Sequence, residues 1–266
     1  MSEMTSYEPG TPSWVELGTP DMEATIGFYN ALLGWDIPEQ PNSAQLGGYR
    51  RAKLRGMDVA GVSPLQSEEQ PPAWSTYISV ANAAATVEAV KAAGGQVVFE
   101  PLDVVGLGTM AIFTDPTGAF FGIWEPGTFA GAELVNEYGA FSWNELHTRD
   151  VAAAKEFYGA VFGWTVDEQD MGEMGTYNVL KLGENMVGGM LDMNATDMPP
   201  EVPPHWLTYF TVENTDAAIE TIKGNGGGVA FGPIDIPVGR FAVVTDNAGA
   251  AFAVMQPSEE TLAEMP

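Results

Sequence analysis

The chain repeats itself, and this internal repeat constrains the possible folds more than any other feature of its 266 residues. Residues 13–37, SWVELGTPDMEATIGFYNALLGWDI, align without a gap on residues 142–166, SWNELHTRDVAAAKEFYGAVFGWTV. The shared letters include Ser-Trp, Glu-Leu, an Asp, Phe-Tyr and a closing Gly-Trp. A fixed internal period indicates duplicated structural units, so the sequence predicts two homologous halves, which we place at residues 1–130 and 138–266.

Each half in turn contains two similar units, because residues 76–104 match residues 208–236 in the same way. In every unit a short alternating strand precedes an Asp or Asn, an amphipathic helix that ends near Gly, and three short strands separated by turns. The Asp or Asn can accept a bond from an unpaired amide of the first helical turn. The sequence therefore predicts an α+β fold of four βαβββ units in tandem, which form two curled sheets.

This order of elements, with a helix that ends in FY and GW and a DPTG turn at 115–118, resembles the vicinal-oxygen-chelate superfamily. That superfamily includes glyoxalase I, bleomycin-resistance proteins and extradiol dioxygenases. The resemblance covers residues 12–256 and is strongest to two-half, glyoxalase-like proteins often described as hydroxylases. It implies that each sheet forms a cup with a ligand inside. It does not imply one activity, because the fold hosts several reactions as well as pure binding.

In that family a divalent metal is usually held by His, Glu or Gln on the first and last strands of each unit. The resemblance places these ligands at eight positions of this sequence: Trp14, Ser75, Trp143 and Leu207 on first strands, and Gly61, Gly122, Gly189 and Ala253 on last strands. Apart from one weak serine hydroxyl, none is a donor that Zn, Ni, Fe or Mn requires. We therefore expect no metal at the inherited site and no other cofactor.

A tryptophan stands at the first-strand ligand position of each half. Trp14 and Trp143 would face space that the smaller last-strand residues vacate, which suits a cup that holds an organic ligand by stacking and apolar contact. The alternative is that both indoles merely fill the space left by the metal and form a solid core. Tyr77, Trp124 and Tyr209 are further candidates for contact with a ligand.

Glu16 and Glu145 follow these tryptophans by two residues, and residues two apart on a strand share a face. Each carboxylate is therefore expected to point into its cup. Burial beside an indole would raise its pKa unless it is paired, and would make it a candidate general acid or base. The alternative is a structural ion pair with Lys53 or Lys181 on the third strand, which we favour for Glu16 more than for Glu145.

Both histidines of the chain lie in the second half. His147 shares a face with Glu145, and the alternation in PPHWLTYF places His205 at the mouth of the same cup. Glu145, His147 and His205 are therefore the candidate catalytic residues, with Glu145 and one histidine as a proton-transfer pair. Two alternatives remain, namely a displaced facial triad for iron or manganese, and simple polar lining.

Charge and composition limit the partners. Ten basic and 36 acidic residues give a net charge of -26, which would repel nucleic acid. Four of the basic residues lie in YRRAKLRG at 49–56, so we expect the N-terminal cup to be the more basic one. Cysteine is absent, which excludes thiol chemistry and disulfides. No segment approaches the roughly 18 apolar residues of a membrane helix, and we expect a cytoplasmic monomer or homodimer.

Three classes of function remain, each with a small organic molecule as partner. We favour a metal-independent enzyme of small-molecule metabolism that uses Glu145 and a histidine for isomerisation, elimination or ring opening. A binding or self-resistance protein that sequesters an aromatic compound would need only the tryptophans. A metal-dependent lyase or dioxygenase would need the displaced triad.

Overall fold

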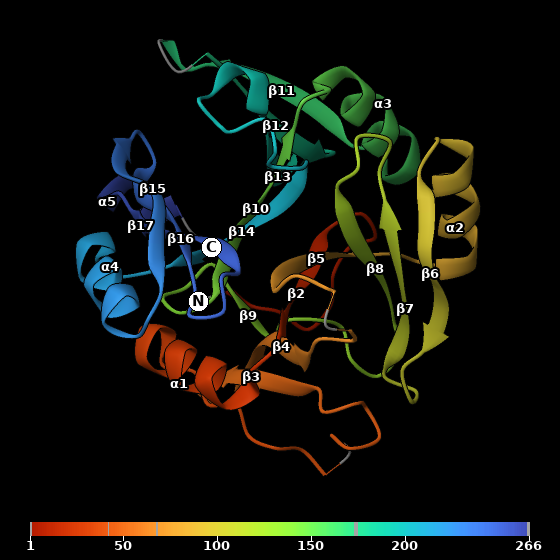
Figure 1. Cartoon of the computed structure of the whole chain (residues 1–266). Coiled ribbons are helices and arrows are strands. Elements are labelled where there is room, and N and C mark those ends of the chain that lie inside the picture. Colours follow the sequence, from red (N-terminus) through yellow and green to blue (C-terminus); the bar gives the residue numbers. More distant parts are fainter. Residues whose placement is uncertain (1, 42, 68, 173–174, 265–266) are drawn as a thin grey trace.

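The computed structural model describes residues 2–41, 43–67, 69–172 and 175–264, and it confirms the predicted α+β fold (Figure 1). A seven-stranded sheet contains, in spatial order, β3 (Arg50–Leu54), β4 (Met57–Pro64), β2 (Pro12–Thr19), β5 (Ala73–Ser79), β8 (Phe120–Pro126), β7 (Gly108–Thr114) and β6 (Gln96–Asp103). An eight-stranded sheet contains β11 (Thr165–Asp170), β12 (Thr176–Leu182), β13 (Asn185–Asp192), β10 (Phe141–Thr148), β14 (His205–Thr211), β17 (Ala251–Pro257), β16 (Gly239–Thr245) and β15 (Gly228–Ile236).

Helices lie on the outer faces of both sheets (Figure 1). They are α1 (Met22–Leu33), α2 (Ala83–Ala92), α3 (Val151–Phe162) and α4 (Thr215–Gly224), with the short α5 (Glu259–Glu264) and a 3₁₀ turn at Met193–Ala195. Each long helix begins as predicted, because an Asp or Asn side chain accepts a bond from an amide of the first turn; these residues are Asp21, Asn82, Asp150 and Asn214. We call the inner, helix-free face of the seven-stranded sheet the N-terminal cup and that of the eight-stranded sheet the C-terminal cup.

The strand register decides which side chains enter the cups. In β10, Leu146 packs with α3 residues in the core, so its neighbours Glu145 and His147 face the C-terminal cup. Glu145 pairs with Gly189 on the parallel strand β13 and with Leu207 on the antiparallel strand β14. Glu16 occupies the same place in β2, opposite Gly61 and Ser75. The first strand of each half is therefore central in its sheet.

The two halves share their cores. Tyr29 on α1 donates a hydrogen bond to Asp246 of the second half (3.1 Å), and Tyr158 on α3 donates one to Asp115 of the first half (3.0 Å). The indole of Trp164, in the second half, also donates a hydrogen bond to the carbonyl of Gly10 in the first half (2.7 Å). In both directions a helix tyrosine thus donates to the aspartate that begins a turn of the other half, Asp115 or Asp246. The duplication therefore extends to the interface between the halves.

The segment between the halves, residues 127–140, is an ordered strap. Its strand β9 (Leu134–Val135) is buried and pairs with β1 (Ser2–Glu3). The amide of Ala132 donates to the carbonyl of Ser13 on β2 (2.8 Å). A side chain at Gly131, which has a φ of +133°, would collide with the same carbonyl, so the strap can approach β2 closely only with glycine here.

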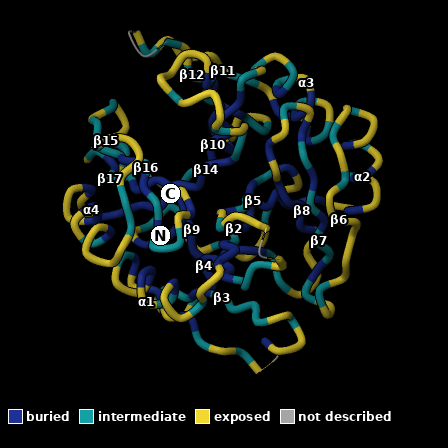
Figure 2. The backbone as a smooth tube through the Cα atoms, viewed as in Figure 1, coloured by how far each residue is buried: buried dark blue, intermediate teal, exposed yellow. Residues whose placement is uncertain are grey.

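Buried residues concentrate in the central strands, whereas the outer faces of the helices and the edge strands β6, β11 and β15 are largely exposed (Figure 2). No helix in the described parts of the chain is long and apolar enough to cross a membrane.

Candidate functional site

Glu145 is the centre of a hydrogen-bonded cluster in the C-terminal cup. His147 Nε2 lies 2.7 Å from Glu145 Oε1, Tyr209 donates its hydroxyl to the same oxygen (3.0 Å), and Tyr177 donates to Oε2. Burial raises the pKa of Glu145, but the bonds from His147, Tyr177 and Tyr209 outweigh burial and hold it below its ordinary value. Glu145 is therefore a carboxylate at neutral pH, not the protonated acid that burial alone would produce.

The structure brings His147 and His205 together beside Glu145. The two histidines face each other across the β10–β14 pair, with ring centroids 4.7 Å apart. His147 Nε2 donates to the ionised Glu145, and its Nδ1 is buried without a hydrogen-bond partner in the described part of the chain. His205 Nδ1 donates to the Pro203 carbonyl (2.9 Å). Burial and the neighbouring His147 lower the pKa of His205 to about 4, so it is neutral at pH 7.

Tyr177 links Trp143 to the carboxylate, and sequence reasoning missed it. Trp143 Nε1 donates to the Tyr177 hydroxyl (2.9 Å), which in turn donates to Glu145. A Cβ at Gly189 would collide with this hydroxyl, so the glycine at the former metal-ligand position makes room for the tyrosine. The available signal was the Tyr that recurs at equivalent places, as Tyr49 and Tyr177, in the two halves.

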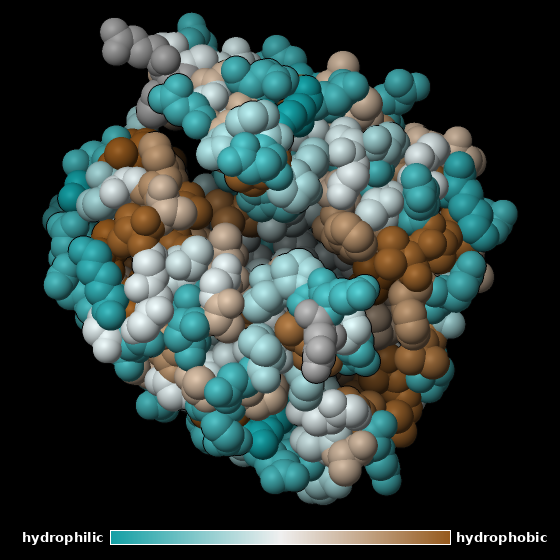
Figure 3. Space-filling view, in the orientation of Figure 1, coloured by the Kyte–Doolittle hydropathy of each residue, from teal (hydrophilic) through white to brown (hydrophobic). Residues whose placement is uncertain are grey.

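Apolar side chains surround the hydrogen-bonded cluster of Glu145, and we call them the apolar wall. Leu207, Tyr209 and Ala253 are buried, and four partly buried side chains pack against them: Trp143, Phe241, Val243 and Met255. Phe231 lies next to Phe241 and is 54% exposed. Figure 3 shows a hollow between the β11–β12 edge and the β15–β17 edge, with hydrophobic residues along the latter. Trp143 is partly buried in this cluster, whereas its counterpart Trp14 in the other half is buried.

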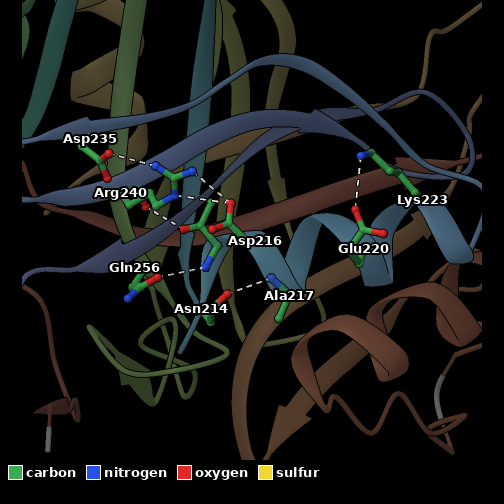
Figure 4. Close-up of polar contacts among 9 residues, drawn as sticks. Asn214, Asp216, Ala217, Glu220, Lys223, Asp235, Arg240 and Gln256 are labelled. Carbon is green, nitrogen blue, oxygen red and sulfur yellow. Dashed lines mark hydrogen bonds and ion pairs between the residues drawn. The ribbon is translucent and has the colours of Figure 1, made fainter.

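Polar contacts hold this wall against α4 (Figure 4). Arg240 on β16 donates to Asp216 on α4 (3.1 Å) and to Asp235 on β15 (2.9 Å). Thr215 donates its hydroxyl to the Arg240 carbonyl (2.7 Å) and its amide to Gln256 on β17 (3.2 Å). The strands that carry the apolar wall are thus tied to the start of one helix.

The N-terminal cup has a carboxyl at the equivalent position, Glu16, but its protonation differs from that of Glu145. Ser63 donates to Glu16 Oε1 (3.1 Å), and Tyr77 also bonds this carboxyl. Gly18 stands where the second half has His147, so Glu16 lacks an imidazole partner. Burial raises the pKa of Glu16 to about 7, against the weaker opposing effect of the two hydroxyls. Glu16, and not Glu145, is the carboxyl that can exchange a proton near neutral pH.

The predicted ion pair between Glu16 and Lys53 is wrong. Lys53 Nζ bonds Asp58 Oδ1 (2.6 Å), and Arg51 binds the other oxygen of the same carboxylate. The physical reason is a register shift between Ala52 and Lys53, which places Lys53 directly opposite Asp58 in the β3–β4 pair. Lys53 therefore binds the carboxylate of Asp58 on the adjacent strand instead of that of Glu16.

The cations that we expected to make the N-terminal cup the more basic one are held in ion pairs. Arg51 and Lys53 share the single carboxylate of Asp58, which offsets only one of their two positive charges. Arg50 pairs with Glu23 (3.3 Å), and Arg55 pairs with Glu137 of the strap. All four cations of residues 49–56 therefore have carboxylate partners.

The strap also fills the N-terminal cup. Phe129 packs edge-on against Trp14, with ring centroids 5.0 Å apart, and lies 6.0 Å from Trp124. Trp14 is 5% exposed, and Tyr77 and Trp124 are also buried. Three of the predicted ligand-contacting residues thus belong to a packed core in this half, whereas Trp143, the counterpart of Trp14, is only partly buried.

The cups do not fit the metal that the family implies. At the positions of the former ligands, Gly61 and Gly189 are covered by Tyr49 and Tyr177. The oxygens of Glu145 already accept bonds, and His205 Nδ1 is engaged with a carbonyl. Within the described ranges, no group of three or more His, Asp or Glu side chains is arranged to hold a metal ion, so the geometry does not support the displaced triad.

Comparison with known sequences agrees with this fold. The pattern of the Glyoxalase/Bleomycin resistance protein/Dioxygenase superfamily matches residues 11–123 and 140–254. A protein named as a glyoxylase, CFP32 of Mycobacterium tuberculosis (strain CDC 1551 / Oshkosh), is 40% identical over 264 residues, which cover 98% of this chain and 100% of that protein. The anthracycline biosynthesis protein DnrV of Streptomyces peucetius is 36% identical over 270 residues and 95% of each chain.

Among solved structures, the Mn(II)-bound glyoxalase from Novosphingobium aromaticivorans has a similar fold, with a TM-score of 0.62 over 96% of this chain and 89% of that one. Its sequence identity is 18%, so this similarity concerns the fold alone. The family pattern, in contrast, covers most of both halves, and the relatives align over nearly the whole chain. The chain therefore belongs to the glyoxalase/bleomycin resistance protein/dioxygenase superfamily, as its repeat and motifs predicted.

Proposed function

We propose that the protein is a metal-independent enzyme that binds a small organic molecule in the C-terminal cup and transfers a proton on it. The observation that carries this proposal is the pair of Glu145 and His147, in which the buried Nδ1 of His147 has no partner among the described residues. The apolar wall beside the pair is partly exposed and suits an organic ligand.

In the proposed reaction, Glu145 orients His147 through its bond to Nε2. Because ionised Glu145 accepts from Nε2–H, the lone pair of His147 is on Nδ1, where it can accept a proton from the ligand. The imidazolium that forms lies 2.7 Å from the carboxylate and returns the proton to another atom of the ligand. Such a transfer isomerises the ligand, or eliminates a leaving group that takes the proton, and neither needs an added cofactor.

His147 Nδ1 is shielded in this structure, so a ligand must displace neighbouring side chains to reach it. The neutral and partly exposed His205 stands beside it and carries no positive charge that would oppose formation of an imidazolium. DnrV is named for the biosynthesis of anthracyclines, which are fused-ring aromatic compounds, and this likeness supports an aromatic ligand.

Deuterium exchange into a carbon acid tests the proposal. 2-Tetralone combines an aromatic ring with exchangeable hydrogens beside a carbonyl, and NMR in D₂O measures their loss. We expect the protein to accelerate exchange, and we expect His147→Asn and Glu145→Gln to abolish the acceleration. Glu16→Gln is the matched control in the other cup and should leave it intact. Acceleration that survives His147→Asn would refute the assignment.

A second candidate, a binding protein without turnover, is favoured by the three hydrogen bonds that hold Glu145. Three donors hold this carboxylate, and its lowered pKa makes it a weak base. In that case 2-tetralone would bind and quench tryptophan fluorescence, but its exchange would remain at the rate in buffer.

A further inference from the structure

The N-terminal cup holds an aromatic ring that belongs to the protein itself. The ring plane of Phe129 makes an angle of 90° with the indole plane of Trp14 and an angle of 75° with that of Trp124. The guanidinium of Arg51 lies 5.2 Å from its centroid. The carbonyl of Phe129 accepts a bond from the Trp124 indole (2.8 Å), which fixes the strap at this point. Edge-to-face contacts at such distances are favourable for aromatic pairs.

The two cups correspond side chain by side chain around this ring. Trp14 is opposite Tyr77 in its strand pair, as Trp143 is opposite Tyr209. The indole of each tryptophan donates to a tyrosine hydroxyl at 2.9 Å, namely that of Tyr49 directly before β3 and that of Tyr177 on β12. The corresponding pairs are Trp14 and Trp143, Tyr49 and Tyr177, Glu16 and Glu145, Tyr77 and Tyr209, and Trp124 and Met255.

The C-terminal cup lacks an equivalent of Phe129. Phe129 lies five residues after Trp124. The residue five positions after Met255, the counterpart of Trp124, is Glu260, which is exposed on α5. Among the described residues, no aromatic ring packs against Trp143 in the way that Phe129 packs against Trp14. The place that Phe129 fills in one cup therefore borders a partly buried tryptophan in the other.

We propose that Phe129 is a built-in occupant of the N-terminal cup, and that its position marks where the C-terminal cup takes an aromatic ring of its ligand. This inference rests on the proposed use of the C-terminal cup and specifies the ligand class. The ring lies edge-on to Trp143, between Met255 and the third strand. The N-terminal cup is a second ring-binding site that the strap keeps closed.

The differences between the cups define the chemistry of the ring. Val179 replaces Arg51, and Met186 replaces Asp58, so the charged pair beside Phe129 has apolar counterparts in the C-terminal cup. An uncharged ring is therefore expected. Beneath it, Glu145 retains lone pairs beyond those that its bonds use, and these can accept a hydroxyl of the ligand. The ligand class is a neutral phenol or a related hydroxylated aromatic compound.

Binding of 2-naphthol and of its saturated counterpart decahydro-2-naphthol, measured by calorimetry, tests this inference. We expect the wild-type chain to bind one 2-naphthol and to bind the saturated alcohol about 2- to 10-fold more weakly, as expected for loss of one aromatic contact. Phe129→Ala should raise the stoichiometry to two, because it empties the N-terminal cup. Phe120→Ala, which truncates a side chain that is 56% exposed, is the control and should leave one site.

Variants of Trp143 test the ring site of the C-terminal cup even if Phe129→Ala does not fold. Trp143→Phe should retain 2-naphthol and its preference over the saturated alcohol, whereas Trp143→Leu should lose the preference. Equal binding of both alcohols by the wild-type chain, or a single site in folded Phe129→Ala, would overturn the inference. Failure of 2-tetralone exchange with these binding results intact would instead refute the proton transfer alone.

Discussion

Glu16 should make the stability of this protein fall as the pH rises from 4.5 towards 7. Its pKa is about 7 in the folded chain, against an ordinary value of 4.5 that we take for the unfolded chain. Between these values the folded state holds a proton that the unfolded state has released, so stability is complete below pH 4.5 and is lost as the pH approaches 7. The difference, at 1.36 kcal/mol for each pH unit, corresponds to about 3 kcal/mol.

Glu16→Gln removes this penalty, because glutamine has the shape of the protonated acid and cannot ionise. At pH 4.5 the variant and the wild-type chain should have nearly equal free energies of unfolding. At pH 8 the variant should be the more stable by about 3 kcal/mol. Urea denaturation followed by tryptophan fluorescence at both pH values measures this difference, in which the contributions of the other carboxylates cancel.

Glu145→Gln is the matched control, since its pKa is shifted in the opposite direction. A carboxylate with a lowered pKa stabilises the folded chain above its unfolded value, and this contribution is lost in acid. Glu145→Gln should therefore be destabilising at pH 8 and less so at pH 4.5. A Glu16→Gln variant with no gain in stability between pH 4.5 and pH 8 would show that the N-terminal cup hydrates or pairs this carboxyl.

Three further predictions concern the cups. Gly189→Ala should displace Tyr177 and destabilise the chain by about 1–3 kcal/mol, as overpacking usually does, and urea denaturation would detect it. Trp14→Ala should remove about 3–5 kcal/mol of stability because this indole is buried, whereas Trp143→Ala should cost distinctly less and abolish binding of 2-naphthol; equal costs would contradict the difference between the cups. Dialysis against EDTA should leave the melting temperature and 2-naphthol binding unchanged, because both oxygens of Glu145 already accept bonds from protein donors, and a loss of either would reveal a metal.

Local patterns predicted most of the architecture. Helix starts depended on single residues such as Asp21 and Asn214, whose side chains bond amides within the same turn. Alternation along β10 placed Glu145 and His147 on one face, since side chains two apart on a strand must share it. The partner of Lys53 could not be predicted in this way, because a register shift between neighbouring strands changes which residues meet.

The duplicated sequence by itself determined the two halves, the family and the concave positions of Trp14, Glu16, Trp143 and Glu145, because these follow from periodicity over a few residues. Only the tertiary structure decided which cup is open. Phe129 reaches Trp14 from a strap more than a hundred positions later in the chain, and no local pattern encodes that approach. The same holds for protonation: equivalent carboxyls acquire opposite pKa shifts because the balance between burial and hydrogen bonds is set by neighbours from different strands.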